Sequence, residues 1–469
     1  MPSRQDQLHS YQFSVQRVVS ALVTRETDPA QFPFRRATVA AFASLMVGIV
    51  LIAGFGVYAL FTGGASDSWK AKGDAVLQEK GTGAHYVYKD KVLHPTLNLA
   101  SALLFAGGQA RVIIEVSPKS LATVPRGPMV GIPDAPDSVP PANRLVKGAW
   151  TVCSVPVEGG AADEGGQRSL LAVGGLLGVN EGGTPMTDET GLAVRIQGDD
   201  GAWLLWRQRR YLIKNLSGEA LGALGVTVDP KQLPIVDRAF LNAFEQGEPI
   251  QAPAVEGTTG EDSGVRDLKV GEVVRFRSAA GDKFYVAAKG QLQEVTQVQA
   301  TLLAPRVSPQ SISDLPDKLG PSLILQGAGA PPASPIKPVD RADKAICATA
   351  ADEQGFASVR YGVAVPDVSG LMRTAGRAAK TGAPLADYIA VEGGRGVLVE
   401  GYTVAKTSSG VRSLVTDVGQ QFPLADEGSQ AALGYSGVQP SKMPVSLVSL
   451  LPQGAQLGKD AAGVAVTLS

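Results

Sequence analysis

Two short motifs contain residue types that acyl-transfer enzymes use. Ser334 and Lys337 form an S-x-x-K, and Lys380–Gly382 is a K-T-G, both pieces of penicillin-binding active sites. A nucleophilic serine of this kind opens a helix, so that the lysine one turn later reaches its hydroxyl. Here Pro332 and Pro335 flank the serine, and no S-D-N lies between the two lysines. The sequence therefore argues against an acyl-enzyme.

No other motif predicts a catalytic, cofactor-binding or metal-binding site. The sequence contains neither a G-x-x-x-x-G-K-[ST] phosphate loop nor the G-x-S-x-G elbow of serine hydrolases. Three histidines and two cysteines cannot supply a four-ligand zinc site of the usual spacing. His94 precedes Pro95 in an expected strand-to-helix turn, where a capping or packing role is favoured. A net charge of −1 argues against nucleic-acid binding.

The segment from Ala37 to Phe61 has 25 residues and no charge. Because about 20 apolar residues cross a bilayer core, this segment is long enough to span a membrane. A cleaved signal peptide is one alternative, but its apolar region covers only about 7–15 residues. A buried core helix is a second alternative, although globular helices of this length seldom lack a polar face. We expect one uncleaved membrane helix.

Charge beside this segment predicts its orientation. Five arginines and three acidic residues precede it, and Arg35 and Arg36 abut the apolar run. Positively charged flanks stay in the cytoplasm, which puts residues 1–36 inside and about 400 residues on the extracytoplasmic side. The exterior part then has a net charge of −3, which predicts no basic patch for anionic lipid.

The leader contains an apolar stripe at helical spacing. Asp28-Pro29 is expected to end this helix, and Arg17 and Arg25 flank the stripe. Such a stripe either lies on the bilayer or docks on a partner, and two basic residues are few for a lipid-bound helix. We therefore favour a partner-binding surface, which consists of Leu8, Tyr11, Val15, Val18, Val19 and Leu22.

The exterior region repeats itself, in the same order and with offsets that drift by only a few residues. At an offset of 199 the matching residues are Tyr86-Val87 with Tyr285-Val286, Leu93 with Leu292, and Leu103 with Leu302. At an offset of 211 they are Trp203, Tyr211 and Ile213 with Leu414, Phe422 and Leu424. The repeated unit is expected to be a strand, a polar turn, a second strand and a helix. In Trp203–Ile213 the turn carries Arg207, Arg209 and Arg210, for which a solvated turn is favoured over contact with an anionic partner.

Cys153 and Cys347 are the only cysteines, and both lie in the exported part, where disulfides persist. They match each other at an offset of 194, so a bond between them would lie near an internal pseudo-two-fold axis and join the two halves. Two separate buried thiols are the alternative. A bond would stabilise the fold by roughly 5 kcal/mol in the chain-entropy model.

We expect an α+β fold, in which a single transmembrane helix precedes an extracytoplasmic domain with a pseudo-two-fold β-rich core and four small repeat units. Each half contains a repeat, a central element and a second repeat. The expected boundaries are cytoplasmic leader 1–36, transmembrane helix 37–61, stalk 62–84, repeat 1 85–145, first half of the core 146–193, repeat 2 194–252, linker 253–270, repeat 3 271–340, second half of the core 341–395, and repeat 4 with the C-terminal tail 396–469.

Several segments resemble the EccB family, a membrane component of the type VII (ESX) secretion apparatus. They are the leader Arg4–Arg17, the lone membrane segment and Tyr88–Ser101, which reads YKDKVLHPTLNLAS. The resemblance extends over nearly the whole chain, including the two cysteines and Pro440-x3-Pro444. It implies an elongated exterior domain with a disulfide-stapled β core, in a single-pass protein of the plasma (inner) membrane.

The resemblance also implies a function and partners. Family members assemble with copies of themselves, EccC-type motor ATPases, EccD and EccE, which predicts a structural assembly subunit rather than an enzyme. Members have also been described as ATPases, so ATP hydrolysis stays as an alternative, with ATP as a cofactor by family description alone. A weaker alternative is a module that binds cell-wall glycan.

Overall fold

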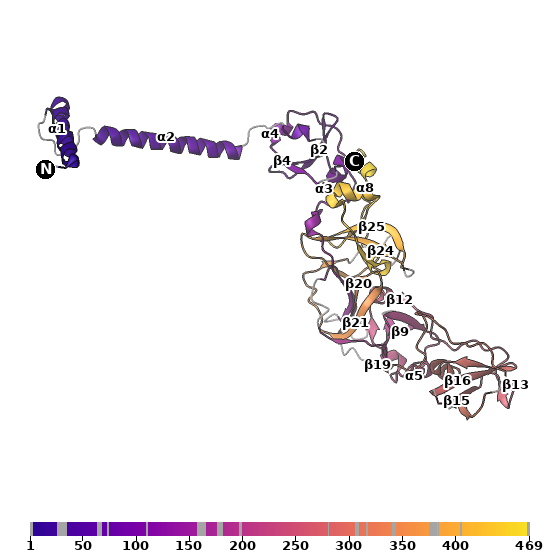
Figure 1. Cartoon of the computed structure of the whole chain (residues 1–469). Helices are drawn as coiled ribbons and strands as arrows, with labels where there is room; N and C mark the ends of the chain where they lie inside the picture. Colours follow the sequence, from indigo (N-terminus) through magenta and orange to yellow (C-terminus); the bar gives the residue numbers. More distant parts are fainter. Residues whose placement is uncertain are drawn as a thin grey trace. The chain divides into compact units, whose positions relative to one another are not determined.

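The computed structural model describes residues 3–25, 35–62, 68–72, 75–108, 111–156, 166–175, 182–196, 199–279, 281–304, 309–315, 318–339, 344–374, 382, 384–403 and 406–466. The chain divides into two compact units, coloured by sequence in Figure 1. The first comprises residues 1–71 with 116–124, and the second comprises residues 72–115 with 125–469.

The first unit begins with two long helices. α1 (Arg4–Thr24) starts with a capping box in which Ser3 Oγ accepts from the Asp6 amide and the Asp6 carboxylate accepts from the Ser3 amide. It ends at Arg25, whose φ is 58°; the predicted stop at Asp28-Pro29 lies outside the described residues. α2 (Arg35–Thr62) encloses the predicted membrane span. Within the described residues it is the one helix long and apolar enough to cross a membrane.

Two short elements complete the first unit. The 3₁₀ helix η1 (Ser68–Ala71) brings Trp69 against α4 (Pro118–Leu121). The Trp69 indole is 3% exposed, and its Nε1 donates to Ser120 Oγ at 3.1 Å. Because burial of an indole N–H without an acceptor is costly, this bond holds η1 on α4.

The second unit is built from small sheets. In strand order, the sheet of repeat 1 consists of β3 (Val92–Pro95), β2 (His85–Lys89), β1 (Val76–Glu79) and β4 (Ile113–Val116), and the sheet of repeat 2 consists of β11 (Ile235–Val236), β8 (Thr190–Ile196), β9 (Ala202–Trp206), β10 (Arg209–Ile213) and β12 (Glu245–Gln246), with β19 (Lys337–Pro338) also on β8. The sheet of repeat 3 consists of β17 (Gln291–Val295), β16 (Gly281–Ala288), β15 (Val273–Ser278) and β18 (Gln310–Ile312). The sheet of repeat 4 consists of β26 (Gln421–Pro423), β25 (Ser408–Thr416), β24 (Gly396–Tyr402) and β27 (Ser441–Pro444). β13 (Asp262–Val265) and β14 (Leu268–Lys269) form a separate hairpin.

A helix follows the hairpin of each repeat, and the next strand returns to the first strand of the sheet. The helices of the second unit are α3 (Leu99–Ala106), η2 (Ala142–Arg144), α5 (Gly218–Ala223), η5 (Pro230–Gln232), α6 (Arg238–Asn242), α7 (Gln297–Leu303), α8 (Glu427–Gln430), η6 (Ala431–Tyr435), α9 (Val445–Val448) and α10 (Lys459–Ala462). In repeats 2, 3 and 4 the returning strand pairs in parallel with the first strand. The sequence predicts the central hairpin and helix but misses these outer strands.

The offset of 199 holds through the hairpins of repeats 1 and 3. β2 and β3 join through Asp90-Lys91, and β16 and β17 join through Lys289-Gly290, with the same number of residues in each turn. Asp90 and Lys91 have φ values of 54° and 62°, as a two-residue type I′ hairpin turn requires. Tyr86 and Tyr285, and likewise Leu93 and Leu292, are therefore structural equivalents and are all buried.

The offset of 211 is wrong by one residue at Trp203. Tyr211 pairs with Leu204 across its hairpin, while Phe422 pairs with Leu414. Leu414 therefore corresponds to Leu204, at an offset of 210, rather than to Trp203. The physical reason is turn length, because Arg207-Gln208 forms a two-residue turn whereas residues 417–419 form a longer turn that ends on a glycine with φ of 68°.

The central sheet is the β-rich core. Among the described residues its strand order is β22 (Met372–Arg373), β23 (Tyr388–Ala390), β6 (Gln167–Ala172), β5 (Trp150–Pro156), β20 (Ala345–Asp352), β21 (Gly355–Val363) and β7 (Thr184–Pro185). The hairpins β5–β6 and β20–β21 meet at the antiparallel β5–β20 pair. Each half also supplies a strand to the other, since β23 pairs with β6 and β7 pairs with β21.

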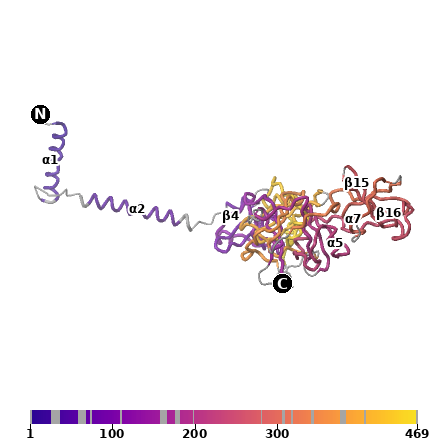
Figure 2. The backbone as a smooth tube through the Cα atoms, turned by 90° about the horizontal axis from the view of Figure 1, so that it is seen from below, coloured from indigo at the N-terminus to yellow at the C-terminus, as the bar shows by residue number. Residues whose placement is uncertain are grey.

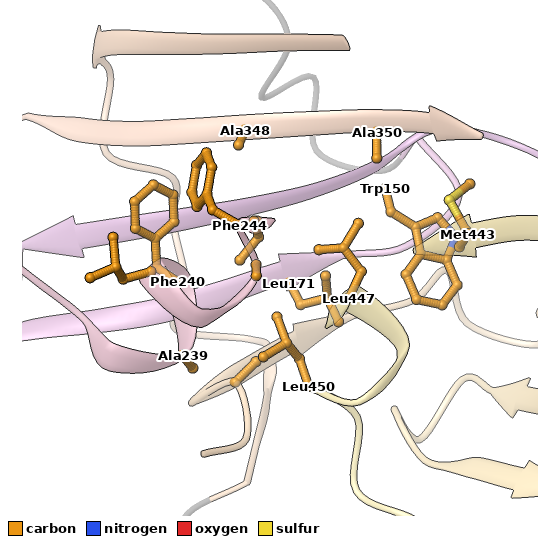
Figure 3. Packing of buried hydrophobic residues seen from close by; sticks show 14 of the residues in the cluster. Trp150, Leu171, Ala239, Phe240, Phe244, Ala348, Ala350, Met443, Leu447 and Leu450 are labelled. Carbon is orange, nitrogen blue, oxygen red and sulfur yellow. The ribbon is translucent and has the colours of Figure 1, made fainter. Parts of the chain in front are cut away.

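One face of this sheet is covered symmetrically by short helices. α6 from repeat 2 and α9 from repeat 4 cover Trp150, Ala348 and Ala350, as Figure 3 shows. Trp150 and Phe240 are fully buried in this cluster. Ser446 Oγ on α9 donates to the carbonyl oxygen of Ala243, just after α6, at 2.7 Å, which fixes the two covers against each other.

The expected α+β class, with a pseudo-two-fold β core and four small repeats, is confirmed. Two boundaries differ from the expectation. The predicted stalk contains β1, which pairs with β2, and the predicted linker contains the β13–β14 hairpin, which packs Val265 and Leu268 on repeat 3. Both segments are too short and too polar to show a strand period in the sequence.

Candidate functional site

The disulfide lies at the centre of the core sheet. Cys153 on β5 stands directly opposite Cys347 on β20, and the bond between their sulfurs is 2.06 Å. On the same face Thr151 and Thr349 are also opposite each other, with their hydroxyl oxygens 3.0 Å apart. Equivalent residues of the two halves therefore face each other across the β5–β20 pair. The bond joins the two halves as the offset of 194 predicts, and the alternative of free thiols is wrong.

A buried polar cluster lies beside the sheet. Asp387 Oδ2 accepts from both the amide and the hydroxyl of Ser169, at 2.9 and 3.0 Å. Asp237 caps α6 by accepting from the Ala239 amide at 2.7 Å. Burial, together with the nearby Asp387 carboxylate, raises the pKa of Asp237. This pair of carboxylates joins repeat 2 to both halves of the core.

A cleft with a volume of about 860 Å³ lies between repeat 2 and the proline-rich segment 324–337. Trp206, Phe356, Pro331 and Pro332 form much of its apolar wall. A cleft of this size can accommodate a small ligand. The charged groups that line it decide which chemistry it can support.

Each cation on the wall is paired with a carboxylate. The ion-pair distances are 2.7 Å for Arg209–Glu245, 3.4 Å for Arg207–Asp188 and 2.6 Å for Lys337–Glu189. The hydrogen bond from Lys337 lowers the pKa of Glu189. Because the two charges in each pair neutralise one another, the described lining of the cleft offers no excess of positive charge to bind a nucleoside triphosphate.

The arginines of the β9–β10 hairpin are less solvated than expected. Arg207 is about half exposed and stacks over Trp206, 4.5 Å from the ring centre. Arg209 is only 20% exposed in its ion pair, and Arg210 donates to the Leu241 carbonyl and lies over Trp203. The expectation of a solvated turn is wrong for Arg209 and Arg210, because their side chains fold back onto the repeat.

Of the two acyl-transfer fragments, the structure describes the S-x-x-K residues and Gly382. Lys337 is a β19 residue whose ammonium group binds Glu189, and Ser334 lies in the extended segment before it. Lys380 and Thr381 of the K-T-G lie outside the described residues. His94 packs edge-on against Phe105 at 5.4 Å, and its Nδ1 is 3.3 Å from the Pro128 carbonyl oxygen, as a packing role requires.

The apolar stripe of the leader is largely uncovered. Leu8, Tyr11 and Leu22 are 55%, 70% and 80% exposed on α1, and Val15 and Val18 are 43% and 60% exposed. Val19 is partly buried. α1 thus presents most of the predicted partner-binding surface to its surroundings.

In the parts of the chain that the structure describes, no group of three or more His, Cys, Asp or Glu side chains could hold a metal ion. Sequence reasoning misses Asp237, Asp387 and Ser169, which lie far apart in the chain. The single local signal is that Asp237 precedes a short apolar run, as a helix-capping residue does.

The chain is similar to known proteins over almost its whole length. The family model for the type VII secretion system ESX-1 transport TM domain B matches residues 1–468. The ESX-1 secretion system ATPase EccB1 of Mycobacterium tuberculosis (strain ATCC 25618 / H37Rv) is 24% identical, over 97% of this chain and 93% of the relative. The ESX-5 secretion system ATPase EccB5 of Mycobacterium tuberculosis (strain CDC 1551 / Oshkosh) is 28% identical, over 97% and 92%.

Two solved structures share the fold. A chain of the intact ESX-5 inner membrane complex matches with a TM-score of 0.61 at 24% identity, over 100% of this chain and 96% of that chain. A chain of the EccB3 dimer from the ESX-3 core complex matches with a TM-score of 0.60 at 24% identity, over 83% and 100%. With the membrane helix, the twinned core and a family match that spans residues 1–468, the chain belongs to the EccB family of type VII secretion systems.

Proposed function

We propose that this protein is a membrane-anchored structural subunit of a type VII (ESX) secretion complex. α2 fixes it in the plasma membrane, and the extracytoplasmic domain packs with copies of itself and with other core components. The observation that carries this proposal is the family match along the whole chain, from the leader through the last strand. Relatives of the same fold occur in an ESX-5 inner membrane complex and in an EccB3 dimer.

The chain is oriented with its N-terminus in the cytoplasm. Arg35 and Arg36 stand at the start of α2, and positively charged flanks remain on the cytoplasmic side. Side-specific labelling of the intact cell checks this orientation. Labelling is expected to reach Lys459 in α10 from outside and Arg4 only after permeabilisation, and labelling of both from one side would overturn it.

The exposed stripe of α1 is the cytosolic docking surface, and its partners are membrane components of the EccC, EccD and EccE types. Replacing Leu8, Val15, Val19 and Leu22 with serine in the full chain removes apolar side chains from this surface. The protein should still insert into the membrane but should no longer co-purify with the complex. Phe13→Ser is the matched control, since Phe13 is 56% exposed on the opposite face of α1. Co-purification that survives the fourfold change would exclude the docking role.

ATP hydrolysis is the alternative function, because the EccB relatives carry the name ATPase. The paired charges of the cleft favour the structural role. Purified full-length protein in nanodiscs with Mg-ATP separates the two functions. Turnover that persists through repeated purification and is lost on Arg209→Ala, with the fold retained, would establish the enzyme. Activity that decreases with each purification step supports the structural subunit.

A further inference from the structure

The segment from Ser68 to Arg126, which includes most of repeat 1, is more basic than the segment at the 199-residue offset, which includes most of repeat 3. Residues 68–126 contain eight basic and four acidic residues, whereas the matching window 267–325 contains seven and six. The net charges are thus +4 and +1. The exterior net charge of −3 predicts no basic patch, but that average conceals a basic repeat at the start of the exterior region.

The two repeats also differ in the ion pairs that their Lys and Arg side chains form. In repeat 3 two cations form ion pairs within the sheet, with Lys283–Glu294 at 3.1 Å and Arg275–Asp282 at 3.6 Å, while Lys269 and Lys289 are exposed. In repeat 1, Lys72, Lys89 and Lys91 are exposed, and none of them forms an ion pair with a described residue. Lys89 Nζ instead lies 4.8 Å from the centre of the Phe105 ring, and the Lys89 residue as a whole is exposed.

These three lysines, the entry lysines, lie at one end of the repeat 1 sheet. β1 and β2 are antiparallel, and Val76, the first residue of β1, pairs with Val87 in the middle of β2. The start of β1, which follows Lys72, and the Lys89–Lys91 turn are therefore at the same end of the sheet. This is the end at which the chain enters the sheet. Lys72 follows Thr62, the last residue of α2, by ten positions, so at most about 35 Å of extended chain separates them.

We propose that the entry lysines bind anionic phospholipid headgroups in the leaflet from which α2 emerges. This contact goes beyond the assembly role and requires only that α2 spans the membrane. An anionic surface attracts each nearby lysine by about 1 kcal/mol, so the covalent tether and three cations together suffice to hold repeat 1 against the bilayer. The contact would orient the exterior domain relative to the membrane.

The experiment uses the full chain in nanodiscs, either of phosphatidylcholine alone or with 30% phosphatidylglycerol. A donor dye on Asp90→Cys and an acceptor on lipid headgroups report the distance of the turn from the bilayer; the native cysteines are protected by their disulfide. Energy transfer should rise with phosphatidylglycerol and fall again in 0.5 M NaCl, because salt screens exposed charges. Equal transfer in the two lipids would overturn the proposal.

Lys72→Glu with Lys91→Glu tests the residues themselves and leaves the Lys89–Phe105 contact intact. It should reduce the ratio of bound to free states by at least about fivefold for each lysine. Lys269→Glu with Lys289→Glu, two exposed lysines of repeat 3, is the matched control and should leave the lipid response unchanged. If this control abolishes the response equally, the effect is one of net charge alone and the assigned site is wrong. Neither result depends on the secretion complex.

Discussion

The exterior domain contains two equivalent pairs of neighbouring repeats, repeats 1 and 4 and repeats 3 and 2, and the two pairs are packed differently. Repeats 1 and 4, the 1–4 pair, share one buried cluster that includes Leu103, Phe422 and Tyr435. In the 3–2 pair, α7 of repeat 3 lies beside α5 of repeat 2 (Figure 2), and it adds Val298 to a cluster whose other buried members are Ile336 and residues of repeat 2. The internal clusters of repeat 3 remain separate.

The closing contacts differ as well. The C-terminal segment is hydrogen-bonded to repeat 1 of the 1–4 pair, since the Val466 amide donates to the Met129 carbonyl oxygen at 2.8 Å. The 3–2 pair instead borders the 860 Å³ cleft and a second cleft of about 160 Å³. The same repeat architecture thus forms a shared core without these clefts in the 1–4 pair and a junction bordered by clefts in the 3–2 pair.

The largest expected effect concerns the bond between the halves, on which both pairs depend. Replacing Cys153 and Cys347 with alanine should lower the free energy of unfolding by up to about 5 kcal/mol, because the bond closes a loop spanning 194 positions. Chemical denaturation of the full chain in detergent measures this loss. Wild-type protein under reducing conditions is the control and should show the same decrease. An unchanged midpoint would mean that the exchanged strands alone hold the halves together.

The next effect separates the two pairs directly. Leu103→Ala in the 1–4 pair should cost about 3 kcal/mol, because Leu103 is 3% exposed in a close-packed cluster. Leu302→Ala, at the repeated position, should cost less than about 1.5 kcal/mol, because Leu302 is partly buried beside the smaller cleft. Thermal unfolding of the two variants provides the comparison. Equal losses would show that the 3–2 junction is as tightly packed as the 1–4 junction.

Two buried tyrosines give a smaller contrast. Tyr435 in the 1–4 pair donates from its hydroxyl to the Pro140 carbonyl at 2.6 Å, while the Tyr211 hydroxyl in the 3–2 pair is buried without a partner among the described residues. Tyr435→Phe should cost about 1 kcal/mol, and Tyr211→Phe should be neutral or stabilising. Unfolding midpoints measure both. A loss for Tyr211→Phe as large as that for Tyr435→Phe would contradict the contrast.

Sequence repetition predicts much of this fold because duplicated residues occupy duplicated environments. Cys153 and Cys347 match because they are related by the pseudo-two-fold axis. A constant offset fails where the repeats differ in length, as at Trp203, since the one additional residue in the turn at 417–419 changes the offset from 210 before the turn to 211 after it. It also misses β1 and β4, whose short strands carry too few residues for a period.

The functional features were less predictable. The cleft arises from how segment 324–337 crosses repeat 2, which no local pattern encodes. Asp237 and Asp387 are 150 positions apart and meet only through Ser169. The entry lysines are visible in the sequence, but their significance depends on their exposure and on the antiparallel pairing of β1 with β2, which puts them at one end of the repeat 1 sheet.

The smallest effect concerns the two helices that cover the core sheet. α6 from repeat 2 is capped by Asp237, whereas α9 from repeat 4 begins after Pro444 without a side-chain cap. Since the pKa of Asp237 is raised in the folded protein, the folded state binds a proton more tightly than the unfolded state does. Stability therefore falls as the pH rises from the ordinary aspartate pKa of about 3.9 through the raised value.

Asp237→Asn should remove this dependence, because asparagine keeps the cap and cannot ionise. The variant should be more stable than the wild type at neutral pH, and the two should converge at low pH, where Asp237 is protonated. The groups that face Asp237 are the Asp387 carboxylate and the Ser169 side chain. Asp387 in turn faces Arg168, whose Nη1 lies 3.4 Å from Asp387 Oδ1. Ser446→Ala on the α9 side, which removes a bond but no charge, is the control and should lower stability equally at every pH. A wild-type-minus-variant difference that does not change with pH would mean that the pKa of Asp237 is not raised in the folded protein, and the assignment to the helix cap would be wrong.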